Sequence, residues 1–242
     1  MTQKITITAG LVLVAFIVVL SLVVAENASE EELTLVAEHM HSHVDQVIAL
    51  KAAVIIGDLE DTREPATWLA EHKAPIGMPS AWAPYEEDMR RFADVAATAA
   101  DLETAAMAVS EIGEACGDCH LASGLKVSFG YAKPPPQDLE NNVTQMQRHL
   151  WAADRMWAAL IGPSDAAWES GTGLLAEVKL QADQLTRDPR KQPRVEELIQ
   201  DARSVGETGR NLESADARTD VYGEFLAICA NCHSLTGGGP RY

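Results

Sequence analysis

Two copies of one motif use every cysteine in the chain. They read Cys116-Gly-Asp-Cys119-His120 and Cys229-Ala-Asn-Cys232-His233. Cys-x-x-Cys-His is the attachment signature of c-type haem, in which two thiols about one helical turn apart bond to two vinyl groups along one edge of the porphyrin. The adjacent histidine then lies beneath the iron and supplies the proximal nitrogen. The pair of motifs therefore predicts two covalently bound haem c groups, with His120 and His233 as proximal ligands.

Three other sites also use cysteine pairs: an exported disulfide, a thioredoxin-like redox pair and a zinc site. A disulfide or a redox pair gives no reason for a histidine directly after the second cysteine, and this histidine occurs in both motifs. Zinc would require both cysteine pairs to converge on one site, although a long stretch of chain separates them. Haem attachment is the reading that uses all six residues.

A second repeated pattern precedes each motif. The stretches MHSHVDQVIALKAAVIIGD from Met40 and MQRHLWAADRMWAALIGPSD from Met146 both begin Met-x-x-His and both reach Ile-Gly near a polar turn. Met40 and His43 therefore correspond to Met146 and His149. A spacing of three residues puts Met and His on one helical face, and both residue types ligate haem iron. We expect His43 and His149 to be the distal ligands; Met40 and Met146 are the alternative, and an open or water-bound iron is the third.

The elements that position these residues are expected to be helices. Apolar residues recur with the helical period in four segments of each half of the chain, and no segment alternates as a strand does. The expected helices cover approximately residues 33–54, 65–72, 85–99, 101–119, 143–160, 168–185, 195–205 and 222–232. The predicted fold class is all-α, with two tandem four-helix-bundle haem modules after an N-terminal apolar segment. The modules are placed at 26–124 and 138–242, joined by a Pro-rich linker at 125–137 that contains three consecutive prolines.

Residues 1–25 are expected to lie outside the helical modules. Lys4 precedes an uncharged apolar stretch, residues 5–25. A charge followed by an apolar run is typical of an export signal, whereas the length of this run suits a membrane-spanning helix. A cleaved signal peptide and a transmembrane anchor through residues 5–25 both remain open. Either one places residues 26–242 in the periplasm or facing it, on the side of bacterial membranes where c-type haem is attached.

A four-helix unit with Cys-x-x-Cys-His on its last helix resembles the cytochrome c-prime family. The resemblance covers about residues 30–124 and 138–236, and it implies a duplicated, diheme c-type cytochrome. It also implies that the first helix of each module covers the distal face of its haem. The sequence departs from the family after each motif histidine, where LASGLK and SLTGGG replace the usual aromatic and basic residues.

Composition and charge narrow the possible functions. The 242 residues include 36 Asp and Glu against 19 Lys and Arg, a net charge of −17 at pH 7. A surface so acidic excludes a nucleic-acid partner and favours basic redox proteins. No catalytic triad, phosphate loop or carboxylate pair stands out, so we expect no enzyme, and the late motifs disfavour a peroxidase. The predicted function is electron transfer between redox partners; the alternative is gas-ligand (NO or CO) binding or sensing of the c-prime type.

Overall fold

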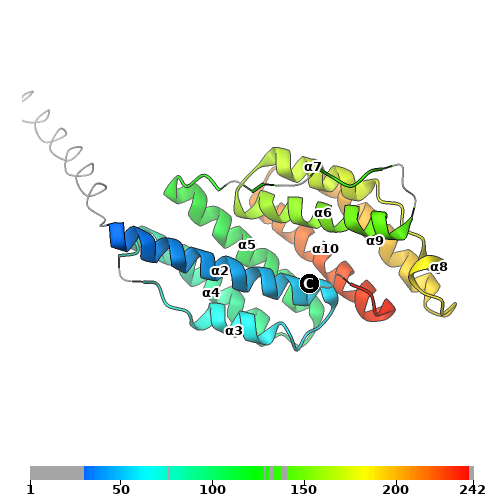
Figure 1. Ribbon diagram of the computed structural model, residues 1–242, viewed down its shortest axis with the longest axis horizontal. Helices are drawn as coiled ribbons and strands as arrows, with labels where there is room; N and C mark the ends of the chain where they lie inside the picture. Colours follow the sequence, from blue (N-terminus) through cyan, green and yellow to red (C-terminus); the bar gives the residue numbers. More distant parts are fainter. Residues whose placement is uncertain (1–29, 76, 128, 131–132, 138–140, 240–242) are drawn as a thin grey trace, which may run out of the picture. The chain divides into compact units, whose positions relative to one another are not determined.

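The protein is described by a computed structural model that covers residues 30–75, 77–127, 129–130, 133–137 and 141–239. These residues form helices joined by loops, with no strand among them (Figure 1). The predicted all-α fold class is therefore confirmed. The predicted signal or anchor at residues 1–25 lies outside the described part of the chain. None of the described helices combines the length and the apolar character needed to cross a membrane.

Two compact units divide the chain. Among the described residues, one unit includes 30–41 and the residues around 74–78, and the other includes 42–73 and the chain from 79 onward. Helix α2 (Glu30–Ile56) contributes its first part to the smaller unit and its second part, with His43, to the larger one. Both Cys-x-x-Cys-His motifs and the Met146–His149 pattern belong to the larger unit. The packing and the site described below involve this larger unit alone.

The helices of the first half of the chain, residues 26–124, follow the predicted segments. After α2 come α3 (Arg63–Glu71), the 3-10 helix η1 (Ser80–Trp82), α4 (Ala83–Ala97) and α5 (Leu102–Ser123). Pro84 lies in the first turn of α4, where a backbone N–H would have no partner within the helix. The side chain of Asp101 caps α5 by accepting a hydrogen bond from the Thr104 N–H. The first motif is thereby placed on the last turns of α5.

In the second half, residues 138–242, one predicted helix is divided into two. The helices are α6 (Asn142–Ile161), α7 (Asp165–Ala176), α8 (Ala182–Leu185), α9 (Gln192–Gly209) and α10 (Ala215–Thr236). The apolar period predicts a single helix over 168–185, but the chain leaves the helical path between α7 and α8. Side chains of α6 supply the hydrogen bonds there. Gln145 Oε1 accepts from the Lys179 N–H at 2.9 Å, and Asn142 Oδ1 accepts from the Gln181 N–H at 3.2 Å.

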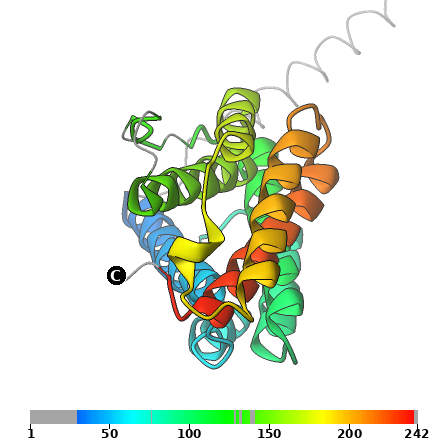
Figure 2. The same cartoon turned by 90° about the vertical axis from the view of Figure 1, so that its right-hand side faces the viewer.

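Helix α10 packs against both α5 and α9, so the two motif-bearing helices are neighbours (Figures 1 and 2). Their close approach depends on Gly223 of α10, where a Cβ atom would come within 2.4 Å of the Met107 Sδ. The core beneath them holds Trp168 and Phe225, both essentially inaccessible to solvent. The Trp168 indole N–H donates to the Gly209 carbonyl at 2.7 Å, so the polar group of this large buried side chain has a hydrogen-bond partner.

Candidate functional site

The second motif lies on the wall of a mostly apolar cavity of about 500 Å³. Helices α6, α8, α9 and α10 line it, together with Ile55 at the end of α2. Its wall includes Met146, His149, Leu198, Cys229, Cys232 and His233. Ligand cavities in proteins commonly have volumes of about 300–1,000 Å³ and mostly apolar walls. A few polar groups in the wall orient the ligand. This cavity has that character, and it joins the motif to the predicted distal residues of the same half.

His233 offers one specific nitrogen to this cavity. Its Nδ1 lies 2.5 Å from the Ile55 carbonyl oxygen, and because a carbonyl can only accept, Nδ1 carries the proton. The lone pair of the neutral ring is therefore on Nε2, the nitrogen that remains available to a metal ion. Burial lowers the pKa of His233, against the opposing effect of the hydrogen bond to Ile55. The ring is thus held in the neutral form that a ligand must have.

His149 is the second imidazole of the cavity. Its Nε2 is buried and has no hydrogen-bond partner among the described residues, and its ring lies 5.0 Å from that of Phe225 between centroids. Burial, with a smaller effect from the charge of the nearby His233, lowers the pKa of His149 to about 4. A buried nitrogen that lacks a partner is costly unless something binds it. Met146 lines the same cavity one turn away, so both predicted distal candidates of this half are present.

The thiols of this cavity are not activated. Burial raises the pKa of Cys229 to about 12 and also raises the pKa of Cys232. Both cysteines are free thiols. Reactive cysteines of redox pairs have lowered pKa values in electropositive, partly exposed surroundings, which is the opposite of what is found here. The environment therefore disfavours a thioredoxin-like pair.

The first motif repeats the histidine–carbonyl contact of the second and the raised pKa values of its thiols. On α5, His120 Nδ1 lies 2.5 Å from the Ile161 carbonyl oxygen, so this ring also keeps its lone pair on Nε2. Burial raises the pKa of Cys116 to about 12, and burial also raises the pKa of Cys119, with a smaller effect from the charge of Glu86. Both motifs thus present thiols that desolvation keeps protonated, beside a histidine whose tautomer is set by a backbone carbonyl.

The predicted distal residues of the first half are placed differently from those of the second. His43 is 9% exposed and lies edge-on to Trp68 and His72 of the α3 region, at centroid distances of 5.7 Å and 5.4 Å. Trp68 and His72 stack on each other at 3.9 Å. Met40 belongs to the smaller compact unit, so the structure brings only His43 of this pair into the unit that holds His120.

Carboxylates gather beside the first motif. A hollow of about 440 Å³ is bordered by α4, α5 and α10, and its acidic residues are Asp88, Glu111, Glu114, Asp118, Asp216 and Asp220. Arg91 adds a positive charge to the same rim. Burial, followed by the negative charges of Asp216 and Glu111, raises the pKa of Glu114 to about 7. Part of the chain's large negative charge is therefore concentrated next to Cys116–His120.

Sequence reasoning missed the two backbone carbonyls that accept from the motif histidines. A main-chain oxygen has no side-chain signature, and its partner is far away in the sequence. The available signal was the repeated Ile-Gly at the end of each apolar stripe, which marks where the helix stops and its last carbonyls become free. No family model, curated protein or solved structure matches this chain.

Proposed function

We propose that this protein is an exported diheme c-type cytochrome that carries single electrons between redox partners. The observation that supports this most is the cavity of the second half. Cys229, Cys232 and His233 line it with His149, the buried Nε2 of which has no partner among the described residues. Two thiols, a neutral proximal imidazole and an apolar interior suit a covalently attached haem, and a second imidazole is able to ligate the iron as well. The residues present therefore fit the group that the motif predicts.

Each residue has a defined role in this proposal. The thiols of Cys116 and Cys119 bind the first haem, haem 1, and those of Cys229 and Cys232 bind the second, haem 2. Each thiol would hold its haem through a thioether formed by addition of S–H across a vinyl group. His120 and His233 hold the iron from the proximal side, with His43 and His149 as the distal ligands. The bound haem supplies a one-electron Fe(III)/Fe(II) couple.

The finer architecture belongs to the same proposal. Four helices of each half, α2 to α5 and α6 to α10 with α8 as an interruption, would form one haem module, with boundaries at 26–124 and 138–242. Residues 1–25 would direct the chain out of the cytoplasm as a cleaved signal or retain it as an anchor. The net charge of −17 and the acidic hollow beside the first motif favour a basic redox protein as partner.

The gas-binding alternative requires an iron with an open distal side. The position of His149 in the cavity argues against an open site at haem 2, since its Nε2, which has no partner in the part of the chain that the structure describes, is available to close it. For this reason electron transfer is preferred to gas sensing.

Expression in a host able to attach c-type haem, with and without residues 1–25, tests the proposal. The purified chain should gain the mass of two haem groups, and a redox titration should resolve two one-electron steps with low-spin spectra in both oxidation states. A double variant Cys229→Ala with Cys232→Ala is the matched control and should lose one haem only. Colourless protein, or a mass gain for one haem in the parent chain, would contradict the proposal.

A further inference from the structure

Each motif histidine is hydrogen-bonded to the opposite half of the chain. His120 of the first half donates to the carbonyl of Ile161, which ends α6 in the second half. His233 of the second half donates to the carbonyl of Ile55, near the end of α2 in the first half. Ile55 and Ile161 follow the repeated residues His43 and His149 by the same interval. The exchange is therefore reciprocal and is part of the duplication.

We propose that each half of the chain positions the proximal ligand of the other half, so that α2 sets His233 at haem 2 and α6 sets His120 at haem 1. The inference rests on the proposed function. A carbonyl that accepts from Nδ1–H fixes the orientation of a ligating imidazole and raises its basicity. A more basic ligand stabilises the oxidised iron and lowers its potential. Ile55 and Ile161 are thus positioning residues that act through their main-chain oxygens.

Gly57 holds the end of α2 against α10. A Cβ atom at this position would come within 2.2 Å of Ser234 Oγ and 2.6 Å of the Ala230 carbonyl oxygen. The Ser234 hydroxyl also donates to the Gly57 carbonyl at 3.2 Å. The backbone at Gly57 has φ of +83°, a conformation that glycine adopts at low cost. Only glycine therefore permits the approach that brings the Ile55 carbonyl to His233.

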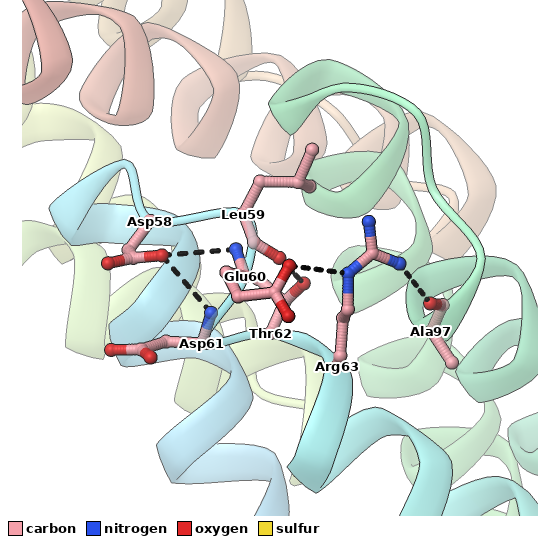
Figure 3. A network of polar contacts seen from close by, with 7 residues as sticks. All are labelled: Asp58, Leu59, Glu60, Asp61, Thr62, Arg63 and Ala97. Carbon is pink, nitrogen blue, oxygen red and sulfur yellow. Dashed lines mark hydrogen bonds and ion pairs between the residues drawn. The ribbon is translucent and has the colours of Figure 1, made fainter.

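The turn after Gly57 is fixed by its own polar contacts (Figure 3). Asp58 Oδ1 accepts from the N–H groups of Glu60 and Asp61 at 3.0 Å and 3.1 Å. Arg63 pairs with Glu60 and donates from Nη1 to the Ala97 carbonyl at 3.0 Å, which ties the turn to the end of α4. Further back on α2, Lys51 Nζ lies 2.9 Å from Asp154 Oδ1 of α6. The end of α2 is held from both sides and has little freedom to move.

Gly117 permits the corresponding close approach of α6 to the first motif. It lies between Cys116 and Asp118, and a Cβ atom there would come within 2.2 Å of the Leu160 carbonyl oxygen. The end of α6 therefore packs directly on the motif turn of α5. The second motif has Ala230 at the corresponding position, so alanine is compatible with the motif itself. Any effect of alanine at Gly117 then comes from displacing α6 and with it the Ile161 carbonyl.

Two variants of the full haem-loaded chain test the exchange. Gly57→Ala should speed hydrogen exchange of the His233 Nδ1 proton about tenfold and raise the potential of haem 2, with haem 1 unchanged. Gly117→Ala should do the same to His120 and haem 1. Gly124→Ala is the control for Gly57→Ala, because Gly124 also has positive φ (+68°) but no atom within 4 Å of its Cβ position. To tell the two haems apart, the variants are also made in a His149→Ala background, in which the altered spin state marks haem 2.

The outcomes separate the inference from the proposed function. Chains that carry two haems but in which Gly57→Ala alters haem 1, or alters neither histidine, would overturn the exchange and leave the cytochrome intact. If Gly57→Ala does not fold, Gly117→Ala decides alone, since alanine favours the helix at that position. Protein without haem would contradict the proposed function, whereas the exchange rates of the two Nδ1 protons would still test the crossed hydrogen bonds.

Discussion

In the proposed cytochrome, His149 is the residue on which the distal chemistry depends. Its pKa of about 4 keeps the ring neutral throughout the physiological range, so no proton competes with iron for Nε2. The cavity also contains Met146, the other residue type able to ligate iron at this place. The choice between them determines whether haem 2 excludes small ligands and how low its potential lies.

Replacing His149 with Ala should open haem 2 to exogenous ligands. The reduced variant is expected to bind CO at one haem per chain, while the parent protein binds little, because the sixth coordination position would be free. Rapid-mixing absorbance with CO measures this directly. Met146→Leu is the matched control and should remain six-coordinate at both haems. CO binding by Met146→Leu but not by His149→Ala would identify Met146 as the ligand instead.

Glu114 should make stability depend on pH near neutrality. Its pKa is raised from 4.5 to about 7 in the folded protein, so the native state binds more protons than the unfolded chain between these values. Stability therefore decreases as pH rises from about 4.5 to about 7 and stays reduced above. Because the side chain is partly solvated, the effect should be no more than about 1 kcal/mol.

Urea unfolding at pH 5 and pH 8 checks the sign of this effect. Glu114→Gln should be more stable than the parent at pH 8 and should reduce the difference between the two pH values. Glu224→Gln, an exposed substitution on α10, should leave the pH dependence as it is. An unchanged pH dependence in Glu114→Gln would show that other carboxylates are responsible.

At the scale of elements, α6 supports the break between α7 and α8 through the amide side chains of Asn142 and Gln145. Gln145 is 1% exposed and accepts from the Lys179 N–H. Gln145→Leu should destabilise the protein by about 0.5–1.5 kcal/mol, because the hydrogen bond between the Lys179 N–H and the buried Gln145 side chain would be lost. The midpoint of urea unfolding measures this. Gln147→Leu, on an exposed face of the same helix, is the control and should cost less than about 0.5 kcal/mol.

The helical elements could be predicted from local pattern because each buries an apolar stripe. The stripes around Val47 and Trp157 fall within α2 and α6, and the N-cap residue Asp101 marks the start of α5 as the sequence suggests. The break after α7 could not be predicted, since its cause is a pair of amide side chains on another helix. Likewise, His149 could be selected from the repeat, but the carbonyl partners of the motif histidines depend on contacts between distant segments.

At the scale of the whole molecule, the net charge should determine how fast the protein associates with its redox partners. Electron transfer to a basic redox protein is expected to slow by about tenfold or more between low and physiological ionic strength, because salt screens the attraction that steers the encounter. Stopped-flow kinetics over a salt series tests this. An acidic redox protein is the control and should show the opposite dependence, and equal rates with both partners at all salt concentrations would contradict a role for charge.

The crossed contacts at His120 and His233 also impose an order on biosynthesis. A chain emerging from its N-terminus presents Ile55 long before His233, so the acceptor of the second motif histidine has already been synthesised when His233 emerges. His120 emerges before Ile161, so its hydrogen-bond acceptor is not available until the next helix has been synthesised. The first motif is therefore incomplete when it emerges and gains its acceptor only when α6 follows, and a fragment that ends at the proline linker, before Ile161, lacks the carbonyl that accepts from His120.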